Sequence, residues 1–208
     1  MTMSFRVIAA VSAATLLLAA CTSVEPGTPS ATETTPGSDR PPASTSQTAA
    51  ESGAPDVENP VDVSAFQADP CLGMTSEQLT ELGLQAGRAT DDEVVGKSCL
   101  WRNENAASVD LAFLAKPGGL DFIYRNKEAD YYKYFVELPP IDGLPAVAAS
   151  TTDSRQTAGE CHVYIGTSKD TAISLATAPS YTKIGNVEAC ELTTRVAKMV
   201  LQTVKTGG

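Results

Sequence analysis

The stretch from Thr22 to Pro60 limits how much of this chain can fold. It consists mainly of Thr, Ser, Pro, Ala and Gly, contains no aromatic residue, and has few larger aliphatic residues beyond Val24 and Val57. Such a segment cannot bury enough apolar surface to offset the entropy that ordering it would cost. We therefore expect residues 21–60 to be a disordered tether and residues 61–208 to form one globular domain.

The residues before this stretch look like a lipoprotein signal. An apolar run from Val7 to Ala20 follows Arg6 and is shorter than the roughly 20 residues that span a bilayer. The run ends in Leu18-Ala19-Ala20-Cys21, which looks like a lipobox, the tetrapeptide at which bacterial lipoprotein precursors are cleaved. We expect residues 1–20 to be removed and Cys21 to carry acyl chains such as palmitate. These would anchor the protein to the outer face of the cytoplasmic membrane. A plain secretory signal or an uncleaved anchor is the alternative.

Cysteine usage fits this location. The chain has five cysteines, and assigning Cys21 to lipid leaves Cys71, Cys99, Cys161 and Cys190, an even number in an oxidising compartment. Four cysteines allow three connectivities. We favour Cys71–Cys99 with Cys161–Cys190, because each pair is local and joins one expected helix to one expected strand. Each bridge would contribute roughly 3 to 4 kcal/mol in the chain-entropy model.

Composition and motifs exclude several classes of ligand. The formal net charge is −10 and no basic cluster is present, so nucleic-acid binding is disfavoured. A metal site is not expected, because there is no C-x₂-C pair and His162 is the only histidine. No cofactor is expected either, since the sequence contains no Gly-rich phosphate loop.

Periodicity predicts an α+β fold. Thr75 and Gln78 have the spacing of a capping box, which predicts a short helix ending at Gly83. Further helices are expected at 120–127 and at 186–206, the last capped by Asn186. Strands are expected at 99–102, 109–115, 146–149, 161–165 and 171–178, with loops at 88–97 and at the prolines of 139–145. The prediction is one antiparallel sheet of about five strands, with short flanking helices and a C-terminal helix, stapled by two disulfides.

A cluster of aromatic residues supplies the candidate binding site. Tyr124, Tyr131, Tyr132, Tyr134 and Phe135 lie within a dozen residues. One interpretation is that they pack the domain while their hydroxyls reach water. The other is that they form an aromatic lip for a glycan, a lipid or a protein partner.

No catalytic constellation is evident. A Ser or Cys nucleophile needs a base within hydrogen-bond reach, and His162 is the only histidine available. It is expected on the strand face opposite Cys161, as a structural or surface residue. The S-x-x-K match at Ser180–Lys183 is interpreted as chance, so no catalytic residue is assigned.

Several motifs together carry a family resemblance. They are the lipobox, the Ser/Thr/Pro tether, Asp69-Pro70-Cys71, the Cys99-x-Trp101 strand, Gly143-Leu144-Pro145-Ala146, Cys161 and Cys190. With them the chain resembles a family of actinobacterial secreted lipoproteins of unknown function, over roughly residues 66–205. The resemblance implies a cell-envelope lipoprotein with the two disulfides favoured above, and it implies no known activity.

The expected function is therefore non-enzymatic binding in the cell envelope. The ligand would be a lipid, glycan or small molecule, or a protein partner. The alternative is an accessory or structural subunit of an envelope complex, and an envelope hydrolase is the remote third choice.

Overall fold

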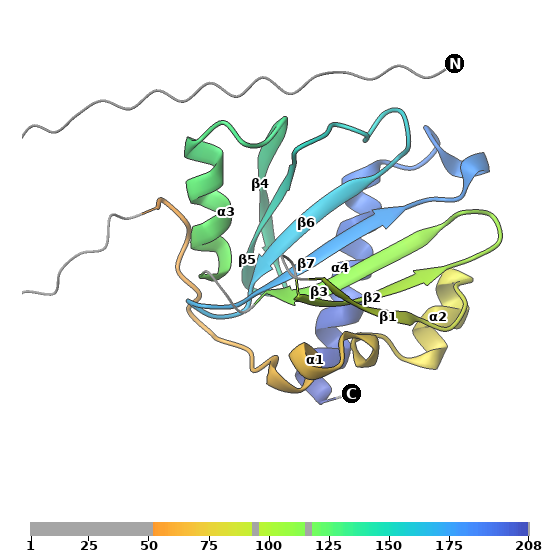
Figure 1. Cartoon of the computed structure of the whole chain (residues 1–208), viewed down its shortest axis with the longest axis horizontal. Helices are drawn as coiled ribbons and strands as arrows, with labels where there is room; N and C mark the ends of the chain where they lie inside the picture. The colour runs from red at the N-terminus through yellow and green to blue at the C-terminus, as the bar shows by residue number, and fades with distance from the viewer. Residues whose placement is uncertain (1–51, 93–95, 115–117, 208) are drawn as a thin grey trace, which may run out of the picture. The chain divides into compact units, whose positions relative to one another are not determined.

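The described part of the chain forms one antiparallel sheet with helices on both faces. The computed structural model describes residues 52–92, 96–114 and 118–207. The expected signal peptide, Cys21 and most of the expected tether lie outside these residues. Within them, seven strands are arranged in the order β1-β2-β3-β7-β6-β5-β4, and every neighbouring pair is antiparallel (Figure 1).

The elements follow one another along the chain in this order: α1 (Ser64–Ala68), η1 (Pro70–Gly73), α2 (Ser76–Leu82), β1 (Arg88–Asp92), β2 (Gly96–Arg102), β3 (Ser108–Leu114), α3 (Gly119–Glu128), β4 (Tyr134–Ile141), β5 (Leu144–Ser150), β6 (Cys161–Gly166), β7 (Ala172–Ala178), η2 (Tyr181–Lys183) and α4 (Ala189–Thr206).

The main core lies between one face of the sheet and α4. Alternate strand residues such as Trp101, Leu111 and Leu175 point to this face and are at most 1% exposed. They pack against Val200 and Leu201 of α4, which crosses behind the strands in Figure 1. Trp101 is thus a residue of the main core.

Helix ends follow the capping rules, with one correction. α2 has the expected capping box, since the Thr75 side chain accepts from the Gln78 amide and the Gln78 side chain accepts from the Thr75 amide. The expected cap of α4 at Asn186 is wrong. α4 begins at Ala189, and the Glu188 carboxylate accepts from the Glu191 amide. A carboxylate at this end is also favoured by the helix dipole.

Two disulfides join helical segments to strands. Cys71 of η1 is bonded to Cys99 of β2, and Cys161 of β6 is bonded to Cys190 of α4. This is the pairing that the sequence favours. The second bridge ties the C-terminal helix to the centre of the sheet.

The sheet has seven strands rather than about five. β1 occupies part of the expected loop at 88–97, and β4 includes Pro139 and Pro140, which were expected in turns. The prolines are tolerated because β4 is an edge strand and its register with β5 shifts between Leu138 and Ile141. An edge strand pairs on one side only, so the amides on its other side are not needed for pairing within the sheet.

The second face of the sheet is only partly covered. Leu120, Ile123 and Tyr124 of α3 pack on Val147 and Ala149 of β5, forming a smaller core. In Figure 1, α3 stands in front of the sheet beside β4 and β5, and among residues 52–92, 96–114 and 118–207 no helix lies in front of β6, β7 and β3. We call this uncovered part, over β2, β3, β7 and β6, the open face.

Packing extends to the N-terminal side of the expected domain boundary at residue 61. The Ser52 hydroxyl donates to the Asp121 carboxylate over 2.7 Å, and Val57 packs against the main core. In the residues that the structure describes, no helix combines the length and the apolar character needed to cross a membrane.

Candidate functional site

A hollow of about 420 Å³ lies on the open face. Its floor comes from alternate residues of four strands: Ser98, Leu100, Asp110, His162, Ser174 and Ala176. Strand register brings them together, because Asp110 of β3 and His162 of β6 both pair with Ala176 of the strand between them. The small Ala176 side chain leaves space above the floor, which makes this the candidate site.

His162 lies at the centre of a cluster of polar side chains on this floor. Its Nε2 atom lies 2.7 Å from Oγ of Ser174, and its Nδ1 atom lies 3.4 Å from the hydroxyl of Tyr164. The His162 and Tyr164 rings also stack, with centroids 4.4 Å apart. Both ring nitrogens therefore have hydroxyl partners, and the imidazole is held in one orientation. As expected, His162 lies on the face opposite Cys161, which is in the main core.

Burial changes the titration of two groups in the hollow. Desolvation lowers the pKa of His162 to about 4, so the imidazole is neutral at pH 7. Although Asp110 is an exposed residue, desolvation of its carboxyl by the surrounding sheet face raises its pKa. A hydrogen bond from Ser98 and the positive charge of Arg102 oppose this rise. In both cases the main cause is desolvation of the group against the sheet face.

The four candidate tyrosines do not form one surface. Tyr124 and Tyr134 are 4% and 8% exposed, and they belong to different cores. The separation arises because successive residues of β4 point to opposite faces: Tyr134 joins the main core, whereas Phe135 packs beside α3. Only Tyr131, which is 59% exposed, and the partly buried Tyr132 are available as surface candidates.

Tyr134 of the main core and Tyr124 of the smaller core have different surroundings. The Tyr134 hydroxyl accepts from the His162 amide over 3.2 Å, and the Arg155 guanidinium lies 4.1 Å from the centre of its ring. Burial raises the pKa of Tyr124 to about 12, with a further contribution from Glu137. Tyr124 and Tyr134 are therefore packing residues. This agrees with the interpretation in which the tyrosines of the cluster pack the domain.

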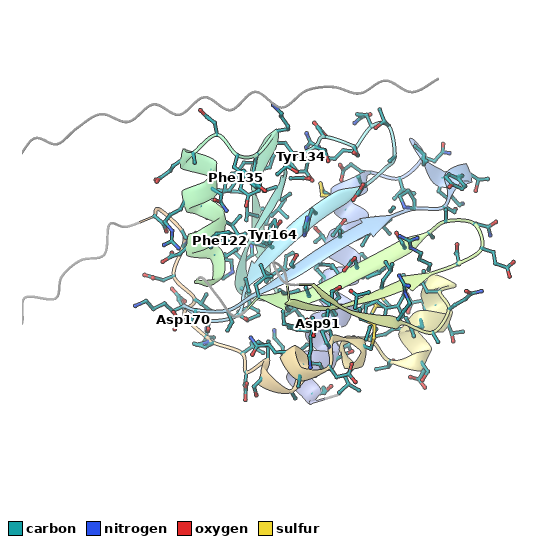
Figure 2. All side chains as sticks on the ribbon, viewed as in Figure 1. Asp91, Phe122, Tyr134, Phe135, Tyr164 and Asp170 are labelled. Atoms are coloured by element: carbon teal, nitrogen blue, oxygen red, sulfur yellow. A yellow bond between two sulfur atoms is a disulfide. The ribbon has the colours of Figure 1, made fainter. Side chains whose placement is uncertain are left out.

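A row of aromatic rings leads from the smaller core to the surface. Ring centroids are 5.0 Å apart between Tyr124 and Phe135, 6.1 Å between Phe135 and Tyr132, and 5.4 Å between Tyr132 and Tyr131. Tyr132 and Tyr164 pack against the same smaller core. Tyr164 is labelled at the border between α3 and the open face in Figure 2. Tyr164 also stacks on His162 of the hollow, so it connects the smaller core with the candidate site.

The contact between Ser174 and His162 resembles a nucleophile and its base, but its setting does not suit acyl transfer. Ser174 pairs with Ala112 of β3 and with Tyr164 of β6, so the amides around it belong to ladders on both sides. A tetrahedral intermediate needs donors aimed at its oxyanion. Ser174 is also only 7% exposed. The Ser174 hydroxyl instead orients the His162 ring on the floor of the hollow.

A metal does not fit the described residues. No three His, Cys, Asp or Glu side chains within residues 52–92, 96–114 and 118–207 are grouped so that they could hold one. The four cysteines described are all in disulfides.

Sequence reasoning did not identify Ser98, Asp110 or Ser174. Their signal is that each lies next to an apolar residue of its strand that belongs to the main core, as Asp110 does between Val109 and Leu111, which marks them as pointing away from that core. That signal places them on the second face of the sheet. It does not show that α3 leaves this part of the face uncovered.

Comparison with known proteins identifies a family but no activity. Neither the curated proteins nor the solved structures include a match to this chain. A family model described as protein of unknown function (DUF3558) matches residues 16–203, which is most of the sequence. The chain therefore belongs to the DUF3558 family of proteins of unknown function.

Proposed function

We propose that this protein is a non-enzymatic binding protein of the bacterial cell envelope, of the actinobacterial lipoprotein type, and that it binds its ligand on the open face. The observation that carries the proposal is the hollow of about 420 Å³ over four strands. Its size is within the roughly 300 to 1,000 Å³ of typical small-molecule sites. Its floor combines hydrogen-bonding groups with apolar surface, as such sites do.

The contrast between the two halves of the second face supports this assignment. Under α3 the face is apolar, with Val147 and Ala149 fully buried. On the open face the corresponding positions are polar or small, as at Asp110, His162 and Ser174. If this part of the sheet face served only to stabilise the fold, it would not need a histidine that two hydroxyls hold in one orientation. Tyr131 and Tyr132 are placed to contact a ligand that extends beyond the hollow on the α3 side.

Location is the second part of the proposal. The apolar run and the sequence Leu18-Ala19-Ala20-Cys21 support cleavage and lipidation at Cys21, with the domain held outside the cytoplasmic membrane by the Ser/Thr/Pro segment. Metabolic labelling with a palmitate analogue tests this. The native chain should incorporate label and the Cys21→Ala variant should not. Label that persists in the variant contradicts lipidation at Cys21.

Binding is tested by blocking the hollow. Ala176→Trp places a large ring on its floor, whereas Ala68→Trp adds the same side chain at an exposed position on α1, outside the hollow. The full-length proteins are purified from membranes in mild detergent, and mass spectrometry identifies the small molecules and proteins that co-purify. We expect one small molecule to be retained by the native chain and by Ala68→Trp, and to be lost from Ala176→Trp.

Two results contradict the proposal. One is a small molecule retained equally by all three proteins, which places its site elsewhere. The other is a stoichiometric protein partner without any small molecule, which favours the accessory-subunit alternative. A smaller change, Ser174→Ala, supports the test if Ala176→Trp does not fold, because it removes one hydroxyl without adding volume.

A further inference from the structure

We propose that the open face recognises an uncharged, hydroxyl-rich ligand of the carbohydrate class. This inference rests on the proposed function, since it names the ligand class of the same hollow. It follows from three properties of the floor: its mixture of donors and acceptors, its balance of charge, and the small apolar surfaces between the polar groups.

Donors and acceptors are interspersed across the hollow. Oγ of Ser98 lies 2.6 Å from Oγ1 of Thr90, and Oγ of Ser174 lies 2.7 Å from Nε2 of His162. Each serine therefore has a partner in the protein and keeps a lone pair that can accept from a ligand. The Asp110 carboxylate also accepts, and the Arg102 guanidinium donates. A ligand hydroxyl both donates and accepts, so a molecule with several hydroxyls can satisfy neighbours of both kinds. A ligand carrying only acceptors, such as a phosphate group, would bring negative charge beside the Asp110 carboxylate without donating a hydrogen bond to it.

Charge on the floor is close to balanced. Arg102 is near enough to Asp110 to stabilise its carboxylate, so each offsets the other's charge. His162 contacts the hydroxyls of Ser174 and Tyr164 and is neutral at pH 7. Glu160, an exposed residue, is the remaining charge lining the hollow. The three charged residues of the lining, one basic and two acidic, leave a net charge of −1, which disfavours an anionic ligand. Between the opposed charges of Asp110 and Arg102, the floor offers several hydrogen bonds to a neutral ligand.

Apolar surface fills the spaces between these groups. Leu100 of β2 and Ala176 and Ala178 of β7 lie on the same floor. A pyranose ring has hydroxyls at its edge and C–H groups on its faces. It can therefore lie on a small apolar patch while its hydroxyls reach the polar groups around it. Neither an ion nor a wholly apolar ligand uses both kinds of surface.

Sugars that share one scaffold and differ in charge provide the test. Methyl glucoside, maltose, glucosamine and glucuronate are titrated into the isotope-labelled full-length Cys21→Ala protein, which removes the expected lipid. Amide shifts in the nuclear magnetic resonance spectrum locate binding. We expect the two neutral sugars to shift amides of β2, β3, β6 and β7 with millimolar or tighter Kd. The amine and the carboxylate should bind at least about tenfold more weakly.

Two variants provide a matched comparison. Asp110→Asn should weaken binding of the neutral sugars by about tenfold, because a charged acceptor contributes more to a hydrogen bond than a neutral one. Asp170→Asn makes the same change at an exposed residue of the loop between β6 and β7, outside the hollow, and should leave Kd unchanged.

Each contrary result has a definite meaning. Tightest binding by glucosamine overturns the neutral-ligand inference in favour of a cationic ligand, and tightest binding by glucuronate overturns it in favour of an anionic one. No shift with any of the four sugars overturns the carbohydrate class. The proposed function fails separately, if the small molecule retained in the membrane purification is indifferent to Ala176→Trp.

Discussion

Nε2 of His162 and Oγ of Ser174 lie 2.7 Å apart on neighbouring strands of the sheet. The contact holds a neutral imidazole in a place where water has little access, because desolvation lowers the pKa of His162 to about 4. Protonation would place a positive charge where burial disfavours it. The contact with Ser174 orients the ring, and burial of the neutral ring makes the stability of the domain depend on pH.

Stability should fall in mild acid because of His162. Its pKa is about 4 in the folded protein and about 6.5 when unfolded, so between these values the unfolded state binds the extra proton. The contribution is fully present above about pH 6.5 and is lost as the pH falls toward 4. We expect about 2 kcal/mol to be lost between pH 7.5 and pH 5.

Urea denaturation of the native protein and of His162→Gln across this range measures the effect. Asp110, whose pKa is raised, contributes the opposite slope, and it does so in both proteins. The variant should lack the His162 slope. Parallel pH profiles for the two proteins would contradict the burial of a neutral imidazole.

Removing the disulfide of α4 should destabilise the domain without changing its fold. Cys161 and Cys190 are separated by 29 residues, and the chain-entropy model assigns such a loop about 3 to 4 kcal/mol. The double variant Cys161→Ala/Cys190→Ala is compared with Cys71→Ala/Cys99→Ala, whose loop is nearly equal, at 28 residues. Circular dichroism in urea should give similar losses. A much larger loss for one pair shows that packing outweighs the chain-entropy effect there.

Tyr124, inside α3, and Tyr131, three residues beyond its end, should contribute differently to stability. Tyr124→Ala should cost about 3 to 5 kcal/mol, because it removes a ring that is 4% exposed and contacts Phe135. Tyr131→Ala should change stability by less than about 0.5 kcal/mol, since its side chain is 59% exposed. Thermal unfolding of the two variants measures this. Equal losses would show that Tyr131 is a packing residue and would remove it from the site.

Gly87 is required by the close approach of its backbone to β2. A Cβ atom at this position would lie 2.5 Å from Sγ of Cys99 and 2.5 Å from Nε1 of Trp101, both fully packed. Gly87→Ala should therefore cost about 1 to 3 kcal/mol through overpacking. The control is Gln85→Ala, at a neighbouring exposed position. Fluorescence of Trp101, the only tryptophan, follows unfolding, and equal stability of both variants would contradict the packing argument.

Local signals in the sequence predict local structure well here. The capping box at Thr75 and Gln78 and the cysteine pairing depend on residues near one another in the chain, and the structure contains both. β1 was missed because its residues, Arg88 to Asp92, are polar and show no alternation. An edge strand gains pairing from one neighbour only, so its sequence carries little apolar pattern.

The candidate site is a different case, because it depends on strand order. Asp110 and His162 are distant in sequence, and they come to lie on either side of Ala176 only because β7 is placed between β3 and β6. No local periodicity encodes that placement. The aromatic cluster misled for a related reason: nearness in sequence suggested one surface, but alternation along β4 sent Tyr134 to the main core.

The strand order also determines how copies of this protein can meet. β1 and β4 are the two edges of the sheet, and each is a poor template for another strand. β4 carries Pro139 and Pro140, which have no amide hydrogen, and an irregular register, while β1 is short and charged. Edges of this kind resist strand addition between molecules. Many copies crowded on one membrane by the proposed anchor would therefore remain separate molecules, each with its own open face available, rather than joining into a continuous sheet.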